Sequence, residues 1–218
     1  MPETESMDNI VEIGNLMAKT LMDEGLVPTT IRDSYYKIIS DTHAEFIYEF
    51  DSLRKIEILL VKTESPAITV EDVVSINTEA QKIFEEDGVY GIYGLKEPGQ
   101  IEYALDRVYN STVFGQDLLP TPMKKAAFLW HRLAKNQSFQ NGNKRTALLV
   151  QSMFLYLNYI WLRYSKKLSD MYEDVSIKIS VNELNEEGIY RFYQKYAFYD
   201  FDRAADVYIK MLKRKLID

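Results

Sequence analysis

The residues best suited to chemistry form one polar stretch, QSFQNGNKRT at residues 137–146. It leads into a strongly apolar segment, about 143–160, that we expect to be a helix. The first amide groups of a helix have no partner inside it, and the helix dipole adds partial positive charge at the same end. Together with Gly142, which lets the backbone approach a ligand closely, these groups predict a site for an anion such as phosphate.

Two cations bear on this prediction. Lys144 and Arg145 fall in the first turn of the expected helix, where the helix dipole disfavours positive charge. Such a placement indicates an anionic partner, whereas the simpler alternative is that both side chains only face water. The residues alone leave both interpretations open, because short motifs also arise by chance.

The elements that would position this stretch read mostly as helices, since apolar residues recur at three- and four-residue spacing. The segment 143–160 is apolar on nearly all sides, which is typical of a helix at the centre of a core. Residues 88–99, rich in glycine and tyrosine, are expected to form a loop or short hairpin. Further helices are expected at 8–24, at 30–62 (where a break could fall near Ser40-Asp41), from Thr69 to about Asp87, at 100–109, from Thr121 to Ala134, from Ser180 to about 195 and at 202–216.

Length and composition narrow the class of protein. The chain has 218 residues, 46% hydrophobic and 27% charged, which suits one globular domain with or without an added helical segment. It has no cysteine, which excludes disulfides and thiolate metal sites. The net charge of −7 argues against a nucleic-acid partner, and the basic cluster Lys210–Lys215 is explained as the cationic end of a helix. The apolar runs are too short to span a membrane and the N-terminus is acidic and polar, so we expect a cytoplasmic protein.

The stretch 137–146 resembles the motif of Fic/Doc proteins, whose general form is His-x-Phe-x-(Asp/Glu)-(Gly/Ala)-Asn-(Gly/Lys)-Arg. The Asn-Lys-Arg ending resembles the Doc, or death-on-curing, branch, because the second arginine of the Fic branch would fall at Leu148. The resemblance runs from about 70 to 160 and leaves 1–65 without a match. Its other similar segments are Gly94-Leu95, Ile101–Leu105, Phe114–Asp117, Lys125–Ala127, Lys135-Asn136 and Phe154–Asn158.

The resemblance implies a fold and an activity. The expected fold is all-α: a Fic/Doc-type helical bundle around a central buried helix, with a short β-hairpin flap, over 66–218, preceded by an N-terminal helical extension over 1–65. Members of the family transfer a nucleotidyl group (AMPylation) or a phosphoryl group from a nucleotide to a protein hydroxyl. The implied ligands are therefore a nucleotide, ATP before others, and Mg²⁺, and the implied protein partners are a target and an antitoxin-like inhibitor.

The resemblance also assigns roles by position. Phe139 would anchor the loop in the core, and a glycine-rich flap near Tyr90–Leu95 would align a segment of the target protein. Phosphate binding would fall to four consecutive residues, Gly142, Asn143, Lys144 and Arg145.

Two motif positions depart from the family pattern. Gln137 stands where the family has the histidine that acts as general base, and an amide cannot accept a proton near neutral pH. Loss of a general base typically costs about 10²–10⁴-fold in rate. Asn141 replaces the acidic metal ligand, and a neutral amide oxygen is a weaker ligand for Mg²⁺. A retained phosphate site that lacks both groups predicts binding without efficient turnover.

Three further residues bear on this chemistry. His131 lies on the helix before the loop and is expected to pack or cap, and His43 lies outside the resemblance, so neither is expected to act as the base. Some Fic proteins carry an inhibitory helix with the pattern (Ser/Thr)-x-x-x-Glu-(Gly/Asn), which Thr20–Gly25 fits with Glu24 as its glutamate. A plain helix end explains the same residues.

Three functions are compatible with the sequence. The first is a Fic/Doc-fold protein that binds a nucleotide or a partner protein and has lost or weakened its transferase activity. The second is an active Doc-like toxin that tolerates Gln137, because positioning and electrostatics supply most of the catalysis in phosphoryl transfer. The third is a helical interaction module without chemistry.

Overall fold

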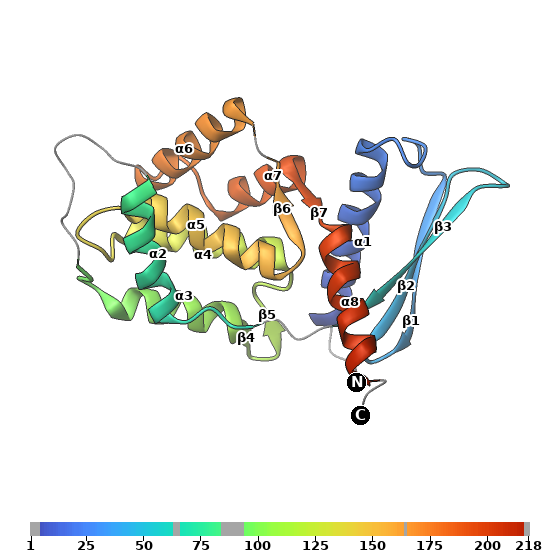
Figure 1. The fold of residues 1–218 in the computed structure, drawn as a ribbon, viewed down its shortest axis with the longest axis horizontal. Coiled ribbons are helices and arrows are strands. Elements are labelled where there is room, and N and C mark those ends of the chain that lie inside the picture. Colours follow the sequence, from blue (N-terminus) through green and yellow to red (C-terminus); the bar gives the residue numbers. More distant parts are fainter. Residues whose placement is uncertain (1–4, 63–65, 84–93, 164, 216–218) are drawn as a thin grey trace.

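The computed structural model describes residues 5–62, 66–83, 94–163 and 165–215, and this part of the chain is mostly helical, as expected (Figure 1). The helices are α1 (Glu5–Asp23), α2 (Val70–Ile83), α3 (Pro98–Tyr109), α4 (Pro122–Asn136), α5 (Asn143–Leu157), α6 (Lys166–Ser180), α7 (Glu186–Tyr196) and α8 (Phe201–Lys215). The strands are β1 (Asp33–Ser40), β2 (His43–Glu49), β3 (Lys55–Val61), β4 (Thr112–Val113), β5 (Gln116–Asp117), β6 (Ile160–Leu162) and β7 (Ala197–Tyr199). Within the described ranges, no helix is both long and apolar enough to cross a lipid bilayer.

Helices α2 to α7 form a bundle around the pair α4 and α5. These two helices pack against each other, and α2, α3, α6 and α7 surround the pair (Figure 1). Two of the expected helix starts, at Thr69 and Thr121, are confirmed. Asp72 N donates to Thr69 Oγ1 (3.2 Å) at the start of α2. Lys124 N donates to Thr121 Oγ1 (3.4 Å) at the start of α4, where Pro122 occupies the first turn.

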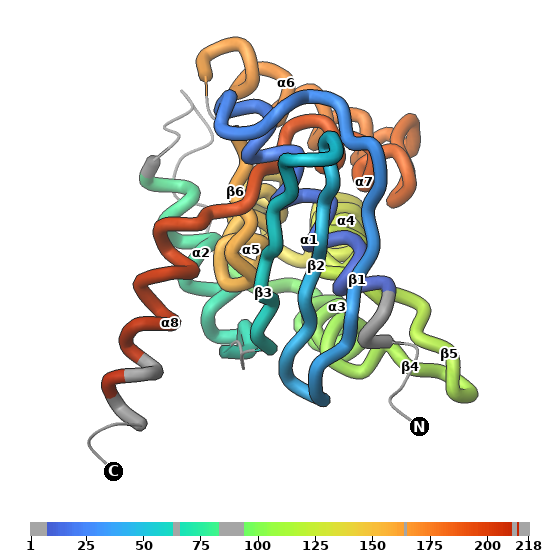
Figure 2. The backbone as a smooth tube through the Cα atoms, turned by 90° about the vertical axis from the view of Figure 1, so that its right-hand side faces the viewer, coloured from blue at the N-terminus to red at the C-terminus, as the bar shows by residue number. Residues whose placement is uncertain are grey.

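The expectation of a long helix over 30–62 is wrong, because these residues form an antiparallel sheet in the order β1-β2-β3 (Figure 2). Side chains alternate between the two faces of a strand, and the buried pair Phe46 and Tyr48 lies on the face that packs toward α1. The turn between β2 and β3 is fixed by Asp51, whose Oδ1 accepts from Leu53 N and Arg54 N, both at 2.9 Å. Alternation and turn chemistry therefore outweigh the helical spacing that the same apolar residues also show.

The segment before α7 also differs from the expectation. Ser180 is the last residue of α6, where its Oγ donates to Ile177 O (2.7 Å), so it does not begin the next helix. Asn185 caps α7 instead by accepting a hydrogen bond from Gly188 N at 3.0 Å. Helix α6 occupies a segment between the helices that we expect from the sequence, where no helix is expected. The first half of the loop or hairpin expected over 88–99, residues 88–93, lies outside the described residues, and α3 begins at Pro98.

Helix α1 is joined to the bundle by polar as well as apolar contacts. Glu12 is buried, and its carboxylate accepts from Thr121 Oγ1 (2.6 Å) and Met123 N (3.1 Å) at the start of α4. Burial raises the pKa of Glu12, and these hydrogen bonds oppose that rise. Near the other end of α1, Thr20 Oγ1 accepts from Tyr199 N at 2.9 Å. The first helix therefore shares the core of the bundle, while the division of the chain at residue 65 stays a prediction.

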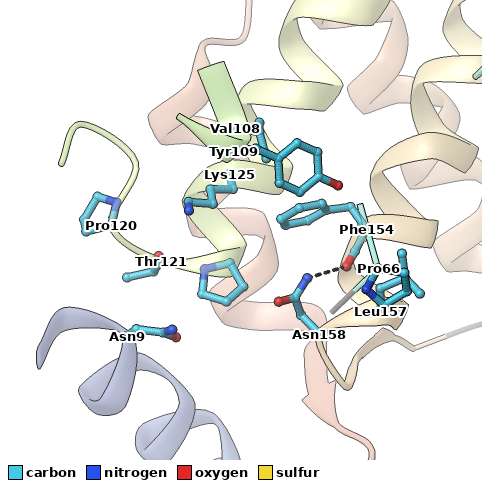
Figure 3. A pocket seen from close by; sticks show the side chains of 11 residues that line it. Asn9, Pro66, Val108, Tyr109, Pro120, Thr121, Lys125, Phe154, Leu157 and Asn158 are labelled. Carbon is cyan, nitrogen blue, oxygen red and sulfur yellow. Dashed lines mark hydrogen bonds between the residues drawn. The ribbon is translucent and has the colours of Figure 1, made fainter. Parts of the chain in front are cut away.

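A cavity of about 210 Å³ lies at the end of the α4–α5 pair that is remote from the 137–142 loop (Figure 3). Its wall includes Lys125 from the first turns of α4 and Phe154 from the last turns of α5. Asn158 Nδ2 donates to Phe154 O at 2.8 Å beside it. Most of the 15 residues of α4, about 20 Å of helix at 1.5 Å per residue, separate the cavity from the loop. The cavity is therefore no part of the predicted anion site.

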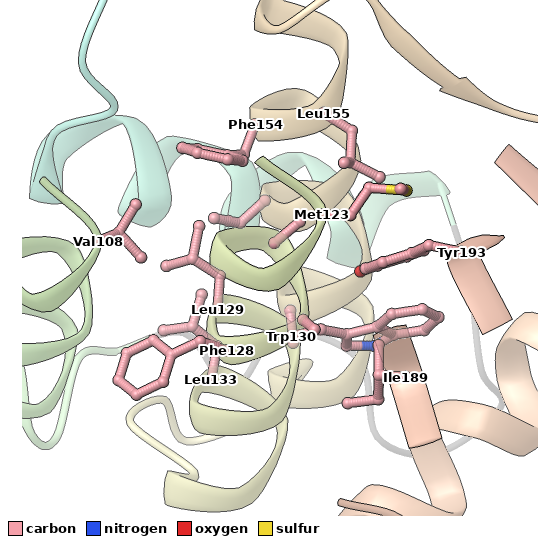
Figure 4. Close-up of a cluster of buried hydrophobic side chains, with 14 of the residues drawn as sticks. Val108, Met123, Phe128, Leu129, Trp130, Leu133, Phe154, Leu155, Ile189 and Tyr193 are labelled. Carbon is pink, nitrogen blue, oxygen red and sulfur yellow. The ribbon is translucent and has the colours of Figure 1, made fainter. Parts of the chain in front are cut away.

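The core behind the loop is built on α4, which buries side chains on several sides (Figure 4). Trp130 stacks on Tyr193 of α7 with ring centroids 6.0 Å apart, and its Nε1 donates to Ser176 Oγ of α6 at 3.1 Å. Helix α4 buries more of its residues than α5 does, so the central position expected for 143–160 is shared by both helices. This packing fixes the end of α4 from which the loop departs.

Candidate anion-binding site

The 137–142 loop connects the C-terminal end of α4 to the N-terminal end of α5. Gln137 ends α4 in the left-handed region (φ 49°, ψ 49°), and Gly142 begins α5 in the same region (φ 76°, ψ 10°). Thr146 N donates to Gly142 O at 2.8 Å, which begins the hydrogen-bond ladder of α5. The amide groups of residues 143–145, between Gly142 and Thr146, come before the first bond of this ladder, so they point out of the end of the helix. The structure thus places the expected amide donors at a helix N-terminus.

Gly142 is required by both backbone conformation and space. Its φ of +76° lies in the left-handed region, which costs most other residues about 1–2 kcal/mol. A Cβ at this position would lie 3.1 Å from Asn77 Nδ2 and 3.3 Å from Gln81 Cγ, which is tighter than ordinary contact. The absence of a side chain lets α2 pack directly against the loop.

The side chains of α2 that meet Gly142 also hold the loop by hydrogen bonds. Asn77 Nδ2 donates to Asn141 O (3.0 Å) and to Thr146 Oγ1 (2.8 Å). Thr146 Oγ1 donates in turn to Gly142 O at 2.9 Å. Gln81 Nε2 donates to Asn77 Oδ1 at 3.0 Å, and both amides are 3% exposed. Neither stands out in the sequence, where the only signal is two amide residues four positions apart in an amphipathic segment.

The side chain of Asn143 forms two hydrogen bonds with the backbone of the loop. Phe139 N donates to Asn143 Oδ1 (2.8 Å), and Asn143 Nδ2 donates back to Phe139 O (2.9 Å). The ring of Phe139 is 3% exposed and belongs to the main hydrophobic core, where a loop anchor would lie. The side chain of Asn143 is committed to the loop itself, so only its backbone amide is placed to meet a phosphate.

A short extended segment runs along the other side of the loop. Leu95 and Phe139 form an isolated antiparallel bridge, and Lys96 N donates to Ser138 O at 2.8 Å. Leu95 belongs to the predicted flap, so the described end of that flap is paired with the loop. The rest of the predicted flap, 90–93, lies outside the described residues.

The two positions that depart from the family motif differ in their surroundings. The side chain of Gln137 is exposed at the start of the loop. Asn141 is partly buried, and its Oδ1 accepts from Gly142 N at 2.7 Å, so this oxygen faces its own loop. In the part of the chain that the structure describes, no three His, Cys, Asp or Glu side chains are grouped so as to hold a metal ion. The residues present fit a phosphate better than a metal.

The two cations of the loop lie at the start of α5. Lys144 is exposed and Arg145 is partly buried, and both belong to the first turn, which contains no acidic residue. Their charges add to the positive end of the helix dipole. The end of α5 can therefore attract and orient an anion through amides and cations together.

Neither histidine reaches the loop. His131 Nδ1 lies 3.4 Å from Glu186 Oε1 on α7, and the interaction with His131 lowers the pKa of Glu186. His43 lies at the start of β2, where its Nδ1 is 2.8 Å from Thr42 Oγ1. The chain therefore brings no imidazole to the position that Gln137 occupies.

Glu24 is also remote from the loop. It is exposed just beyond the end of α1, on the opposite side of the molecule from the start of α5 (Figure 1). Gly25 follows with a φ of +71°, and its N–H donates to Met22 O at 3.0 Å, as in an ordinary helix end. In this structure the end of α1 is remote from the loop of its own chain, and the inhibitory role considered for Glu24 stays a prediction.

The fold and the loop define a helical domain whose central helix pair presents an N-terminal helix end beside two cations. The Fic/DOC family model matches residues 67–155, which run from α2 into α5 and contain the whole loop. Toxin Doc of Mycolicibacterium smegmatis is 30% identical over 95 residues, which cover 44% of this chain and 72% of that protein. The chain therefore belongs to the Fic/Doc family. Helix α1 and the three-stranded sheet lie outside the family match.

Proposed function

We propose that the loop at the start of α5 binds the phosphates of a nucleotide, ATP before others, and that the group transfer of the family is lost or weakened in this chain. The observation that carries the proposal is a contrast within one loop. A hydrogen-bond network that is buried or partly buried holds the backbone of 138–146 in place, whereas position 137, which would have to accept a proton, bears an exposed amide.

Three features support phosphate binding. The amides at the start of α5 precede its hydrogen-bond ladder and point outward. Lys144 and Arg145 add two positive charges in the same turn. The contacts of Asn77 and Asn143 hold the loop in one conformation, so little conformational entropy is lost when an anion binds.

Gln137 supports the weakened transfer. A general base must take a proton from the attacking hydroxyl within hydrogen-bond reach. A glutamine amide can accept a hydrogen bond and orient that hydroxyl, but it does not take the proton near neutral pH. His131 and His43 are engaged elsewhere, so we expect a rate lower by about 10²–10⁴-fold than that of a site with a histidine.

Mg²⁺ would enter this site with the nucleotide. The ion prefers charged oxygens and usually keeps several waters, with substrate phosphates as further ligands. Asn141 offers a neutral oxygen that already accepts from Gly142 N. We therefore expect nucleotide affinity to depend only weakly on Mg²⁺.

The similarity to a Doc toxin favours a second candidate function. In this alternative the chain is an active toxin that transfers a nucleotidyl or phosphoryl group to a protein hydroxyl and is held in check by an antitoxin. Positioning and electrostatics supply most of the catalysis in phosphoryl transfer, so the retained loop could support slow transfer without a strong base.

Calorimetric titration of ATP and GTP, with and without Mg²⁺, tests the proposal when combined with protein labelling from nucleotide radiolabelled at either the α- or the γ-phosphate. Binding without labelling is the expected result. Labelling that disappears in the Arg145→Ala variant would support the active transferase instead. If the chain shows neither nucleotide binding nor protein labelling, the interpretation that remains is a helical interaction module.

A matched control comes from the start of another helix. Lys166 and Lys167 are exposed in the first turn of α6, so a Lys166→Ala, Lys167→Ala variant removes two cations from a comparable position. We expect this variant to bind nucleotide as the wild type does. The Lys144→Ala, Arg145→Ala variant should bind more weakly, by about 1.5–3 kcal/mol for each lost contact with a phosphate.

A further inference from the structure

Strand β1 is an edge strand with both faces open. In the described part of the chain it pairs with β2 alone (Figure 2), and all 8 of its residues are exposed. Unpaired N–H and C=O groups along such an edge form a template for another strand. Its large aromatic and aliphatic side chains are Tyr35 (45% exposed), Tyr36 (36%), Ile38 (38%) and Ile39 (55%).

Helix α1 covers part of the sheet but does not cover β1. Helix α1 packs against β2 and β3, and a Cβ on Gly14 would lie 2.2 Å from Phe46 Cδ2, so that ring packs directly on the helix. Tyr36 pairs with Phe46 across the two strands, with ring centroids 6.1 Å apart, yet it is exposed. The apolar face of the sheet therefore continues past its helix onto β1.

The edge carries few of the features that usually protect one. Proteins block exposed edges with proline, bulges or charged side chains. Strand β1 contains no proline, and its irregularity falls between Ile38 and Ser40, near one end. Its charged residues are Asp33 and Lys37, which have opposite signs. The regular part of the strand is therefore neutral and able to complement itself.

We propose that β1 pairs with β1 of a second copy of the chain, antiparallel and centred on Tyr35, so that the two sheets become one. The two-fold axis of such a pair stands perpendicular to the sheet, so residues that face each other across it lie on the same face. Asp33, Tyr35 and Lys37 share one face, because side chains alternate along a strand.

Charge selects this register over its neighbours. With the axis at Tyr35, Asp33 of each copy faces Lys37 of the other, and the two Tyr35 rings face each other. An axis at Lys37 would place two lysines opposite each other, and an axis at Tyr36 would put both charges opposite neutral residues. Opposite charges and aromatic pairs stabilise facing strands, whereas like charges destabilise them.

A second copy suits this edge better than an unrelated strand. The chain has a net charge of −7, so two copies repel each other at most approaches, but β1 holds one acid and one base in an order that complements itself. Two paired edge strands bury less surface than the roughly 1,200–2,000 Å² of a stable interface, so the dimer should be reversible. The nucleotide site lies on the other side of the molecule, so this proposal does not depend on it (Figure 1).

Sedimentation velocity of the full chain over a concentration series tests the proposal. Asp33→Lys or Lys37→Asp alone places like charges opposite each other twice, and each should raise the dimer dissociation constant about tenfold. The combined Asp33→Lys, Lys37→Asp variant restores both pairs and should return to the wild-type constant. Glu102→Lys, an exposed change of the same charge on α3, should leave the dimer unchanged.

A cysteine at the axis gives a second readout, because the chain has none of its own. Tyr35→Cys should form a disulfide-linked dimer under mild oxidation, since the two thiols would face each other. Leu53→Cys, 92% exposed in the turn after β2, should not. A wild type that stays monomeric at every concentration would overturn the proposal. So would folded single-charge variants that dimerise as tightly as the wild type. A combined variant that dimerises no more tightly than the single-charge variants would overturn it as well.

Discussion

Replacement of Asn77 by alanine separates the scaffold of the loop from its charges. Asn77 donates to Asn141 O (3.0 Å) and Thr146 Oγ1 (2.8 Å) and accepts from Gln81 Nε2 (3.0 Å). At about 0.5–1.5 kcal/mol for each hydrogen bond, these contacts amount to roughly 3 kcal/mol of the free energy of unfolding. The Gln81 amide would stay buried without its acceptor, which moves the expected loss toward about 4 kcal/mol.

Urea denaturation measures this loss directly, and an ATP titration well below the unfolding transition should show weaker binding, because the backbone around Gly142 is no longer held. Thr78→Ala is the matched control on the same helix. Thr78 Oγ1 donates to Val74 O (3.2 Å) one turn earlier, so its removal should cost less than about 1 kcal/mol and leave affinity unchanged. An Asn77→Ala chain with wild-type stability and affinity would refute the role assigned to α2.

Three further changes have defined outcomes. Gln137→His with Asn141→Asp should raise label transfer to protein by up to about 10²–10⁴-fold, and unchanged labelling would count against a weakened site. Gly142→Ala should lower the free energy of unfolding by about 1–2 kcal/mol or more, because φ is +76° and Asn77 leaves little room; a neutral effect in urea denaturation would contradict this. The raised pKa of Glu12 means that the folded chain holds this proton more tightly than the unfolded chain, so its contribution to stability falls as pH rises above the ordinary value of 4.5. The stability of the wild type relative to Glu12→Gln should therefore fall as pH rises above 4.5, and parallel curves of stability against pH would show the shift to be absent.

Local signals in the sequence predicted much of the helical core. The helix starts at Thr69 and Thr121 depend on residues three positions apart, so they are legible without knowledge of the fold. The loop can be recognised for the same reason, since Gly142 and the cations Lys144 and Arg145 stand at the start of a strongly apolar segment. Such features need no distant partner, and the structure reproduces them.

Features that depend on distant partners were not predictable in this way. Asn77 and Asn141 are 64 residues apart in sequence, and nothing near Asn77 indicates that contact. The segment 30–62 carries apolar residues whose spacing fits a helix as well as a strand, and only the alternation through Phe46 and Tyr48 and the turn at Asp51 favour the sheet. The side chain of Asn143 is another case, because the motif assigns it to the ligand whereas it bonds to Phe139.

The most direct test of nucleotide binding at the start of α5 is the backbone amide NMR spectrum of the chain during titration with ATP. We predict that the largest shifts fall on the amides of 142–145, and that they disappear in the Lys144→Ala, Arg145→Ala variant while persisting in the Lys166→Ala, Lys167→Ala control. Shifts confined to the cavity near Lys125, or a spectrum that ATP leaves unchanged, would contradict a phosphate site at this helix end.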